Sequence, residues 1–327
     1  MYVCFMIEIA ALRALVAVEQ QGSVVAASEA MGFSPSAVSQ QIKKLEKQSG
    51  VTVLERHGRG VLLTDRGMAL AEYGRRILGE LEELQATLLA DPAKPSGVLR
   101  LVAFSTACRG LVGPMLGKLG RAQAVAAASS ASSGHGRSGH GGSGLEIRVV
   151  AEDPREAVQR VATGEADLGV VHNWHSVPLV IPENMVHEDL CLDTADVLLN
   201  SAHPLAGQTA VEPPDLVDES WISTPAGAIC NEALLAILAG LGRVPDIRIY
   251  DPDFSTHIAM VQQGVAVALV PRLGRPELPA GVVAVPVVNP MQQRQVGIVY
   301  RKTMTASPSI RHVVRLLQDV AAGLEVD

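Results

Sequence analysis

The sequence predicts an α+β protein of several domains, and three observations carry this prediction. Residues 6–90 show the apolar spacing and the capping residues of helices, with one short strand-like interruption. Residues 91–97 contain Pro92, Pro95 and Gly97 and form a breaker-rich linker. Residues 98–322 alternate strand-like and helix-like runs, which indicates parallel strands joined by crossover helices. A chain of 327 residues is long enough for two or three domains.

The composition fits a folded chain and excludes several classes of protein. Hydrophobic residues make up 48% and charged residues 19%, so a large core is available and disorder throughout is excluded. The apolar runs are broken before they reach the ~18 residues that a membrane helix requires. The net charge of −7 excludes a uniformly basic nucleic-acid-binding surface but leaves room for a local basic face. The four cysteines lie far apart and the N-terminus lacks the features of a signal peptide, so we expect a cytoplasmic protein.

The first block has clear helix boundaries. An amphipathic helix begins near Ile9 and ends at Gly22, and Ser23 then caps a second short helix that ends at Gly32. Ser34 caps a third helix with Pro35 at its first position, where no amide hydrogen is needed. The tight turn between the second and third helices predicts a helix-turn-helix.

The third helix is expected to point a polar face outward. Short hydroxyls and amides can read base edges in the major groove of DNA, and lysines can hold phosphates. The side chains in question are Ser36, Ser39, Gln40, Lys43, Lys44 and Lys47, together with the cap Ser34. The alternative is an ordinary solvated helix face, because polar helix faces are common.

A hairpin with a basic tip follows the third helix. Residues 51–54 and 61–63 are strand-like, and Arg59 between them is placed to enter a minor groove as part of a wing. Residues 35–66 hold six basic and three acidic side chains, a net charge of +3. The positive charge is therefore confined to the expected contact surface.

A long helix runs from the cap Thr64 to about residue 89. Its apolar positions step by four, three and four residues from Ile77, which is the spacing of a coiled-coil seam. The seam residues are Leu70, Ile77, Leu81, Leu84 and Leu88. A dimer formed along this seam would present two reading helices to a two-fold-symmetric operator. The alternative is a helix that packs on its own domain.

The residues from Ser34 to Glu46 and from Leu63 to Gly67 resemble the winged helix of the LysR-type transcriptional regulators, in an ordered match over about 60 residues. Pro35 departs from the family pattern, because it removes a side-chain base contact at that position. The resemblance implies a cytoplasmic DNA-binding regulator, commonly a tetramer of two dimers, with RNA polymerase as a further partner and a bilobed C-terminal effector domain of the periplasmic-binding-protein-like type.

The expected domains follow from this resemblance. The winged helix-turn-helix occupies residues 6–64, the dimerisation helix 65–90 and the hinge linker 91–97. One effector subdomain comprises residues 98–173 and 282–322 and the other comprises 174–281, with hinges near 173–176 and 276–284. Residues 122–144 depart from the family, and their Gly, Ser and Ala content predicts a flexible surface loop. Its histidines are too loosely placed to predict a metal site.

The effector is expected to bind between the two subdomains. Ser105 and Thr106 lie where a strand meets a helix, and such junctions can hold a small anion, although simple capping explains them equally well. The resemblance places this junction in the effector cleft. The expected effector-binding residues are Ser105, Thr106, Asp153, His172, Trp174, Thr224 and Asp253. Trp174 could equally be a packing residue.

The sequence shows no sign of catalysis. It contains no GxSxG, HExxH or phosphate-binding loop, so we expect no enzyme, no cofactor and no metal site. The bilobed architecture also occurs in solute-binding proteins and enzymes. A small-molecule-binding protein or enzyme with a non-functional N-terminal domain is therefore the alternative to a regulator.

Overall fold

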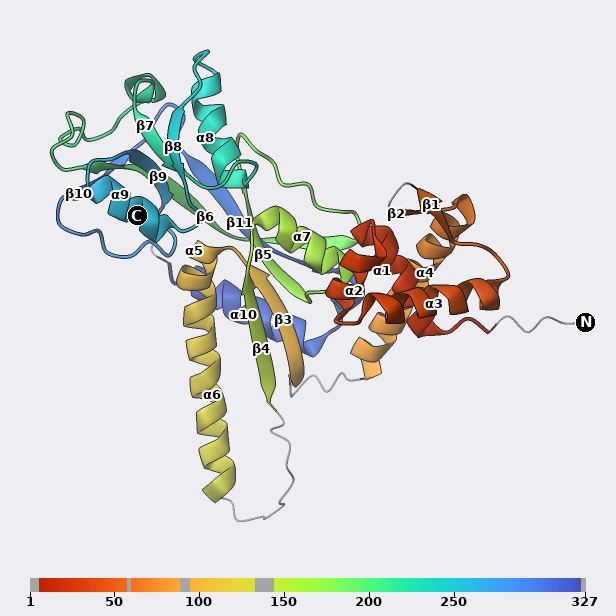
Figure 1. The fold of residues 1–327 in the computed structure, drawn as a ribbon. Helices are drawn as coiled ribbons and strands as arrows, with labels where there is room; N and C mark the ends of the chain where they lie inside the picture. The colour runs from red at the N-terminus through yellow and green to blue at the C-terminus, as the bar shows by residue number, and fades with distance from the viewer. Residues whose placement is uncertain (1–5, 58–59, 89–94, 133–143, 325–327) are drawn as a thin grey trace, which may run out of the picture. The chain divides into compact units, whose positions relative to one another are not determined.

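The computed structural model describes residues 6–57, 60–88, 95–132 and 144–324 (Figure 1). The chain divides into two compact units, an N-terminal unit of residues 1–91 and a C-terminal unit of residues 92–327. Among the described helices, no single one is long and apolar enough to cross a membrane. The helices α1 and α2 meet that criterion only as a pair, with a bend of 117° between them.

The N-terminal unit is a winged helix-turn-helix followed by a long helix. Its elements are α1 (Ile9–Gln21), α2 (Val24–Met31), α3 (Pro35–Ser49), β1 (Leu54–His57), β2 (Gly60–Leu63) and α4 (Asp65–Leu88). The predicted caps are confirmed, since the Ser23 hydroxyl accepts from the Ala26 amide and the Ser34 hydroxyl accepts from the Ala37 amide. Gly32 ends α2 with φ of +68°, a conformation that favours glycine.

The core of this unit lies between α1, α2 and α3. Val38, Ile42 and Leu45 of α3 are buried against α1, so the opposite face of α3 is left on the surface. A Cβ atom at Gly67 would lie 2.1 Å from the Val53 carbonyl oxygen. That close contact explains why a glycine occupies this position in the first turn of α4, directly after the wing.

The C-terminal unit is built on one mixed sheet. Its strands are β3 (Gly97–Ala103), β4 (Leu145–Ala151), β5 (Leu168–Trp174), β6 (Met185–Asn200), β7 (Ser220–Ser223), β8 (Asp246–Tyr250), β9 (Val267–Pro271), β10 (Val282–Pro286) and β11 (Gln293–Arg301). The strand order is β4-β3-β5-β11-β6-β9-β7-β8, and β10 pairs with β6. The helices are α5 (Ser105–Ala107), a π-helical turn (Cys108–Val112), α6 (Gly113–Ser132), α7 (Pro154–Thr163), α8 (Ile229–Ala239), α9 (Phe254–Gln262) and α10 (Pro308–Ala321), with 3-10 turns at Pro213–Leu216 and Lys302–Met304.

Two subdomains form where helices cover the two halves of this sheet. In subdomain I, α6 and α10 pack on one face and α7 packs on the other (Figure 1). In subdomain II, α8 covers one face and α9 the other. Val197 of β6 belongs to the α8 side and the next residue, Leu198, to the α9 side, as strand alternation requires.

Strand β6 passes from one subdomain to the other, and the chain returns to subdomain I at the start of β11. The first half of β6 pairs with β11 in subdomain I, and its second half pairs with β9 and β10 in subdomain II. The passage lies at Asp193 and Thr194 in β6, opposite Arg294 and Gln293 in β11. Strand β10, which was expected in subdomain I, pairs with the second half of β6 and so lies in subdomain II.

The region after β3 also differs from expectation. The helix begins at Ser105, directly after the strand, and not near residue 109. Residues 122–132 continue α6 instead of forming a loop. Their alanine content explains the difference, since alanine has the highest helix propensity. The remainder of the expected loop, with His135 and His140, lies outside the described residues.

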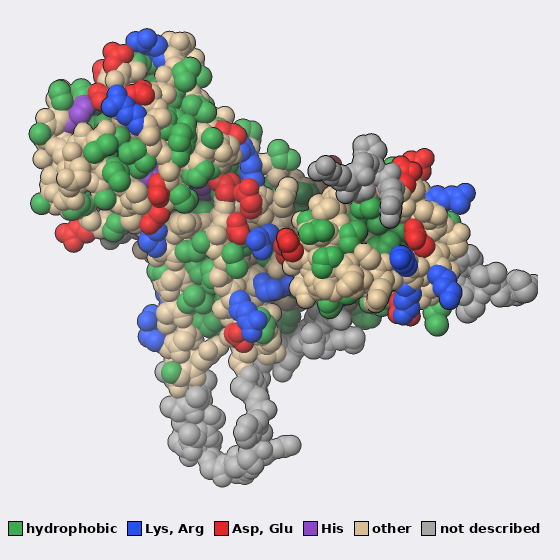
Figure 2. Space-filling view, in the orientation of Figure 1, with side chains coloured by type: hydrophobic (Ala, Val, Ile, Leu, Met, Phe, Trp, Pro, Cys, Tyr) green, Lys and Arg blue, Asp and Glu red, His purple; other side chains and the backbone are tan. Residues whose placement is uncertain are grey.

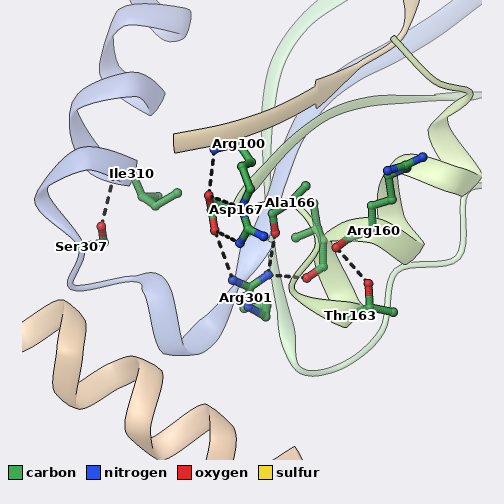
Figure 3. A network of polar contacts seen from close by, with 9 residues as sticks. Arg100, Arg160, Thr163, Ala166, Asp167, Arg301, Ser307 and Ile310 are labelled. Atoms are coloured by element: carbon green, nitrogen blue, oxygen red, sulfur yellow. Dashed lines mark hydrogen bonds and ion pairs between the residues drawn. The ribbon is translucent and has the colours of Figure 1, made fainter. Parts of the chain in front are cut away.

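A partly buried ion-pair network joins three elements of subdomain I (Figure 3). The Asp167 carboxylate accepts hydrogen bonds from the amide and the guanidinium of Arg100 at 2.7–3.1 Å, and Arg301 lies 3.7 Å away. Arg301 also donates to the carbonyl oxygens of Val161 and Ala166. Because Asp167 precedes β5, this network holds the end of the strand that is remote from His172.

Candidate functional site

The outward face of α3 is a row of polar side chains on the N-terminal unit. Ser36, Gln40, Lys43, Lys44 and Lys47 are exposed, and Ser39 is half-buried. Figure 2 shows lysine and arginine side chains on the surface of this unit, interspersed with a few acidic ones. The arrangement can therefore bring hydroxyl and amide groups to base edges, with ammonium groups beside them for phosphates.

The hydroxyls at the start of α3 also serve the helix itself. The Ser34 hydroxyl caps α3 and lies 2.9 Å from the Ser36 hydroxyl. Ser34 therefore has a structural role whether or not it contacts DNA. Phe33, in the turn just before it, is 60% exposed and was not singled out from the sequence. Only the structure shows that this aromatic side chain is exposed beside the polar row of α3, where it could contact DNA as well.

The three lysines of α3 have different surroundings. The Lys44 ammonium donates to the Glu8 carboxylate at 2.7 Å, and this hydrogen bond lowers the pKa of Glu8 below its ordinary value. Within the described part of the chain, Lys43 and Lys47 have no acidic partner. Arg59, the expected minor-groove residue, lies outside the described residues. Lys43 and Lys47 are thus the cations of this face that are available to phosphates.

Replacing Glu8 with Gln should strengthen DNA binding. The Glu8→Gln variant removes the counter-charge of Lys44 and keeps a side chain that can still pair with Gln48. We expect the slope of log K against log salt to steepen by up to about one, because one more ammonium is free to displace a counterion. Titration of labelled duplex DNA at several salt concentrations measures this slope. A Glu19→Gln variant, whose partner Arg75 lies in α4, is the matched control, and an unchanged slope for Glu8→Gln would show that Lys44 makes no phosphate contact.

The expected seam on α4 divides into two parts. Leu70 packs against the core of the N-terminal unit, and a Cβ atom at Gly74 would lie only 3.0–3.1 Å from Leu12 and Val16 of α1. This part of α4 is therefore used inside its own unit. Further along, Ile77 and Leu84 are exposed and Leu81 is half-buried, whereas the Leu88 side chain lies outside the described residues. The apolar side chains available to a partner are those from Ile77 onward.

A buried arginine lies at the centre of the C-terminal unit. Arg294 of β11 is 1% exposed and pairs with Asp193 of β6, its guanidinium nitrogen lying 2.7 Å from the carboxylate. The same guanidinium donates to the Thr106 hydroxyl at 2.7 Å. It lies over the rings of Phe104 and Trp174, at 4.8 and 5.9 Å from their centroids. Thr106 is thus buried and partnered, while Ser105 is half-buried at the start of α5.

His172 and Trp174 lie beside this arginine at the end of β5. Both are 2% exposed, and the His172 ring meets the Phe104 and Trp174 rings edge-on. The His172 Nε2 atom lies 3.8 Å from the Cys230 sulfur of α8. Burial, and next the charge of Arg294, lower the pKa of His172 well below its ordinary value, so the ring is neutral at pH 7. Burial also raises the pKa of the Cys230 thiol.

Asp153 connects the two subdomains. Its carboxylate accepts from the Arg155 amide at the start of α7 and from the Ile229 amide at the start of α8. Burial raises the pKa of Asp153 above its ordinary value, against the effect of these two hydrogen bonds. Beside it, Arg155 of α7 pairs with Glu232 of α8 at 2.5 Å and donates to the Gly227 carbonyl. Both helix N-termini are thus occupied by a carboxylate of the chain itself.

Thr224 borders a small hollow in subdomain II, with Ser223, Cys230 and His257 as its other polar residues. The apolar walls come from Ile222, Leu234, Phe254 and Leu269. The hollow has room for about one water molecule.

Asp253 does not line this hollow. Its carboxylate caps α9 by accepting from the Ser255 amide, and it lies 3.7 Å from the Arg109 guanidinium with half of its side chain exposed. The structure therefore gathers six of the expected effector residues near one another and leaves Asp253 in a surface ion pair.

The sequence did not point to Asp193, Arg294, Cys230 or His257. Nothing local marks the first two, because β6 contains several other acidic residues and Arg294 lies between two glutamines of β11. Among the described residues, no group of three or more His, Cys, Asp or Glu side chains is placed to hold a metal ion. The chemistry of this region is therefore hydrogen bonding and apolar contact around one neutralised ion pair.

Two family models match the chain. The model described as LysR substrate binding domain matches residues 142–322. The model described as bacterial regulatory helix-turn-helix protein, lysR family, matches residues 9–68. Together they cover α1 to the start of α4 and most of the C-terminal unit.

The matches to individual relatives and solved structures cover between 75% and 97% of this chain. The HTH-type transcriptional regulator YbhD of Escherichia coli K12 is 22% identical over 311 residues, which cover 95% of this chain and 90% of that protein. The HTH-type transcriptional activator IlvY of Salmonella typhimurium is 26% identical over 248 residues, 75% of this chain and 76% of that one. A full-length OxyR structure from Pseudomonas aeruginosa superposes with a TM-score of 0.63 at 19% identity and covers 97% of this chain and 98% of that chain, which supports the fold.

Proposed function

The chain belongs to the LysR family of transcriptional regulators, and from this premise we propose that it reads promoter DNA with α3 as a homodimer and responds to a small molecule bound between its two C-terminal subdomains. It has the helix-turn-helix and the effector-binding domain of that family. The observation that carries the DNA-binding part is the exposed polar row on α3, opposite a buried apolar face.

The contacts with DNA follow from the positions on α3. Ser36, Ser39, Gln40 and Lys43 read base edges, and Lys47 holds a phosphate. Lys44 joins the phosphate contacts only when it leaves Glu8. Arg59 of the wing, and Ser34 beside its capping role, complete the proposed DNA-binding residues.

The dimer uses the exposed part of α4. Ile77, Leu81, Leu84 and Leu88 keep the seam spacing, and Ile77 and Leu84 are apolar side chains that a partner helix would cover. Two such dimers form the homotetramer that we propose, acting in the cytoplasm with RNA polymerase as a further partner. We propose no catalytic role, because the curated relatives are transcriptional regulators.

The effector site lies around Arg294, between the end of β5 and the start of α8. Ser105, Thr106, Asp153, His172, Trp174 and Thr224 contribute to it, and Asp253 is best placed to act at its rim. When the effector closes the cleft, the angle between the two subdomains changes. This change alters how the subunits pack in the dimer, and so transmits the binding of the effector to the DNA-binding domains.

A gel-shift experiment tests the proposal. The purified chain is titrated onto the DNA upstream of its own gene and onto a random duplex of equal length, at a fixed salt concentration, while light scattering gives its mass. We expect a preference of about 10³-fold or more for the upstream fragment and a mass of a dimer or tetramer. A monomer with equal affinity for both duplexes would overturn the proposal and favour the solute-binding alternative.

A further inference from the structure

Buried polar atoms without partners gather in one region of the C-terminal unit. Among the described residues of this unit, the side-chain atoms without a hydrogen-bond partner are His172 Nδ1, Trp174 Nε1, Trp221 Nε1, Thr224 Oγ1 and His257 Nδ1. All five residues are more than nine-tenths buried. Buried polar groups are nearly always paired in folded proteins, so a group left unpaired calls for a missing partner.

Four of these five side chains lie around Cys230. His172 Nε2 is 3.8 Å from the Cys230 sulfur, and the Trp174 indole also lies close enough to this sulfur to lower the pKa of the Cys230 thiol, against the larger effect of burial. Thr224 and His257 line the hollow that Cys230 also borders. Cys230 therefore links His172 and Trp174 of β5 with the hollow of subdomain II. Trp221 does not line this hollow, although it packs in the same apolar core under α8 as Trp174.

The charges of this region are already neutralised. Arg294 pairs with Asp193, and Arg155 pairs with Glu232. Burial lowers the pKa of both His172 and His257, so the two rings are uncharged at pH 7. The Asp153 carboxylate already accepts from the first amides of α7 and α8. Both arginines that face this region in the described part of the chain are thus paired, so an anion entering here would have to displace a carboxylate.

The hydrogen-bond roles of the unpaired atoms are partly fixed. His257 Nε2 lies 2.8 Å from the Asp251 carbonyl oxygen, which only accepts, so Nε2 carries the proton and Nδ1 is a bare acceptor. The Trp174 nitrogen only donates, and the Thr224 hydroxyl does both. A ligand that satisfies this set must bring a donor for His257 and an acceptor for Trp174 or Thr224. A carboxylate has acceptors alone.

We propose that the effector of this regulator is an uncharged molecule with a compact apolar body that carries both a hydrogen-bond donor and an acceptor, such as a primary amide, held between Thr224, His257, Trp174 and His172. The proposal rests on the function proposed above and names the ligand class of the same site. It departs from the small anion that the hydroxyl-rich junctions suggest. The apolar body lies against Phe254, Leu234 and Ile222, which already line the hollow.

Binding requires the two subdomains to separate first. The hollow is lined by subdomain II and has room for about one water molecule. A larger ligand therefore extends from it toward His172 and Trp174, into space that opens when α8 moves away from β5 and α7. The contacts that hold these helices together are the Asp153 bridge and the Arg155–Glu232 pair, and the latter is more than one-third exposed on both sides. The exposed ion pair contributes little to stability, so the main cost of separation is the loss of the Asp153 bridge and of the packing of Trp174 against α8.

Two series of nearly isosteric probes test the ligand class on the full-length protein. The first series is benzamide, benzoate and benzamidinium, and the second is isobutyramide, isobutyrate and isobutyramidinium. Thermal unfolding and calorimetric titration are followed at pH 7 with each probe at millimolar concentration. We expect at least one amide to raise Tm by about 2–4 °C and to bind saturably, while the matching anion and cation have no effect.

Variants locate the binding site. Thr224→Val and His257→Phe should each abolish the amide response. Thr224→Val should also leave the Tm of the ligand-free protein unchanged or higher, because the hydroxyl that it removes has no partner. Trp221→Phe is the matched control, since it removes an equally buried unpaired N–H outside the site and should keep the response.

Each outcome decides the proposal. A larger response to either carboxylate or amidinium, no response to any of the six probes, or an amide response that survives Thr224→Val and His257→Phe overturns it. The same preparations are tested for binding to the upstream DNA fragment. If the protein binds DNA but does not respond to an amide, only the proposed ligand class is wrong. If the protein does not bind the upstream DNA fragment, the proposed regulatory function itself is wrong.

Discussion

Replacing both Ser39 and Gln40 with Ala should weaken operator binding by about 10- to 100-fold and leave non-specific DNA binding nearly unchanged. A good bidentate contact from an amide to a base pair is worth about 1–3 kcal/mol of discrimination, and Gln40 is the amide on the exposed face of α3. Ser39 is half-buried beside it and contributes the smaller part. Gel shifts with the upstream fragment and a random duplex, at one salt concentration, measure the two affinities separately.

Lys47→Ala is the matched comparison on the same helix. Lys47 is exposed and has no acidic partner among the described residues, so its loss should weaken binding to both duplexes and reduce the salt slope by about one. If the double variant lowered both affinities equally, or if none of these changes altered the footprint on the upstream fragment, α3 would not be oriented in the groove as proposed.

Replacing Arg294 with Met should cause a large loss of stability in the C-terminal unit. The change leaves the Asp193 carboxylate buried without its counter-charge and leaves the Thr106 hydroxyl without its donor. Breaking a buried ion pair by removing one partner costs about 3–5 kcal/mol. Tm should fall by roughly 10 °C in differential scanning calorimetry. Arg248→Met is the control, since Arg248 and Asp246 are both more than half exposed and solvent screens their pair, so Tm should change little.

A second substitution separates the charge from the packing. Asn at position 193 keeps an oxygen for the Leu273 amide, which donates to Asp193 at 2.9 Å, but carries no charge. The double variant Arg294→Met with Asp193→Asn should therefore recover a substantial part of the lost stability. A double variant as unstable as Arg294→Met alone would mean that the loss comes from the cavity and the aromatic contacts of the guanidinium.

The parts of the fold that depend on neighbouring residues could be predicted from the sequence. Ser23, Gly32 and Ser34 mark helix boundaries through contacts within a few residues, and the structure places the boundaries there. The polar and apolar faces of α3 follow from helical spacing for the same reason. The helix over residues 122–132 differs from the expected loop, because the helix propensity of its alanines outweighs the overall Gly, Ser and Ala composition of the segment.

The parts that depend on distant residues could not be predicted. Asp193 and Arg294 are 101 residues apart in the sequence, and nothing local distinguishes a buried pair from two surface charges. The extent of β6 into both subdomains likewise depends on its partners β11, β9 and β10. The topology rule predicts a ligand region at the strand ends, but the acceptor that we propose at His257 depends on the packing of α9 against β7.

The position of β6 and β11 in the strand order determines where a rearrangement could be observed. These two strands are hydrogen-bonded neighbours in the middle of the sheet, and β4 and β8 form its opposite edges. If one subdomain rotated against the other, the β6–β11 pair would twist. Atoms would then move in proportion to their distance from this pair of strands. Fluorescent labels beside Thr194 and Gln293 would report almost no change in separation, whereas labels at Glu146 in β4 and at the exposed Val244 before β8 would report the largest one.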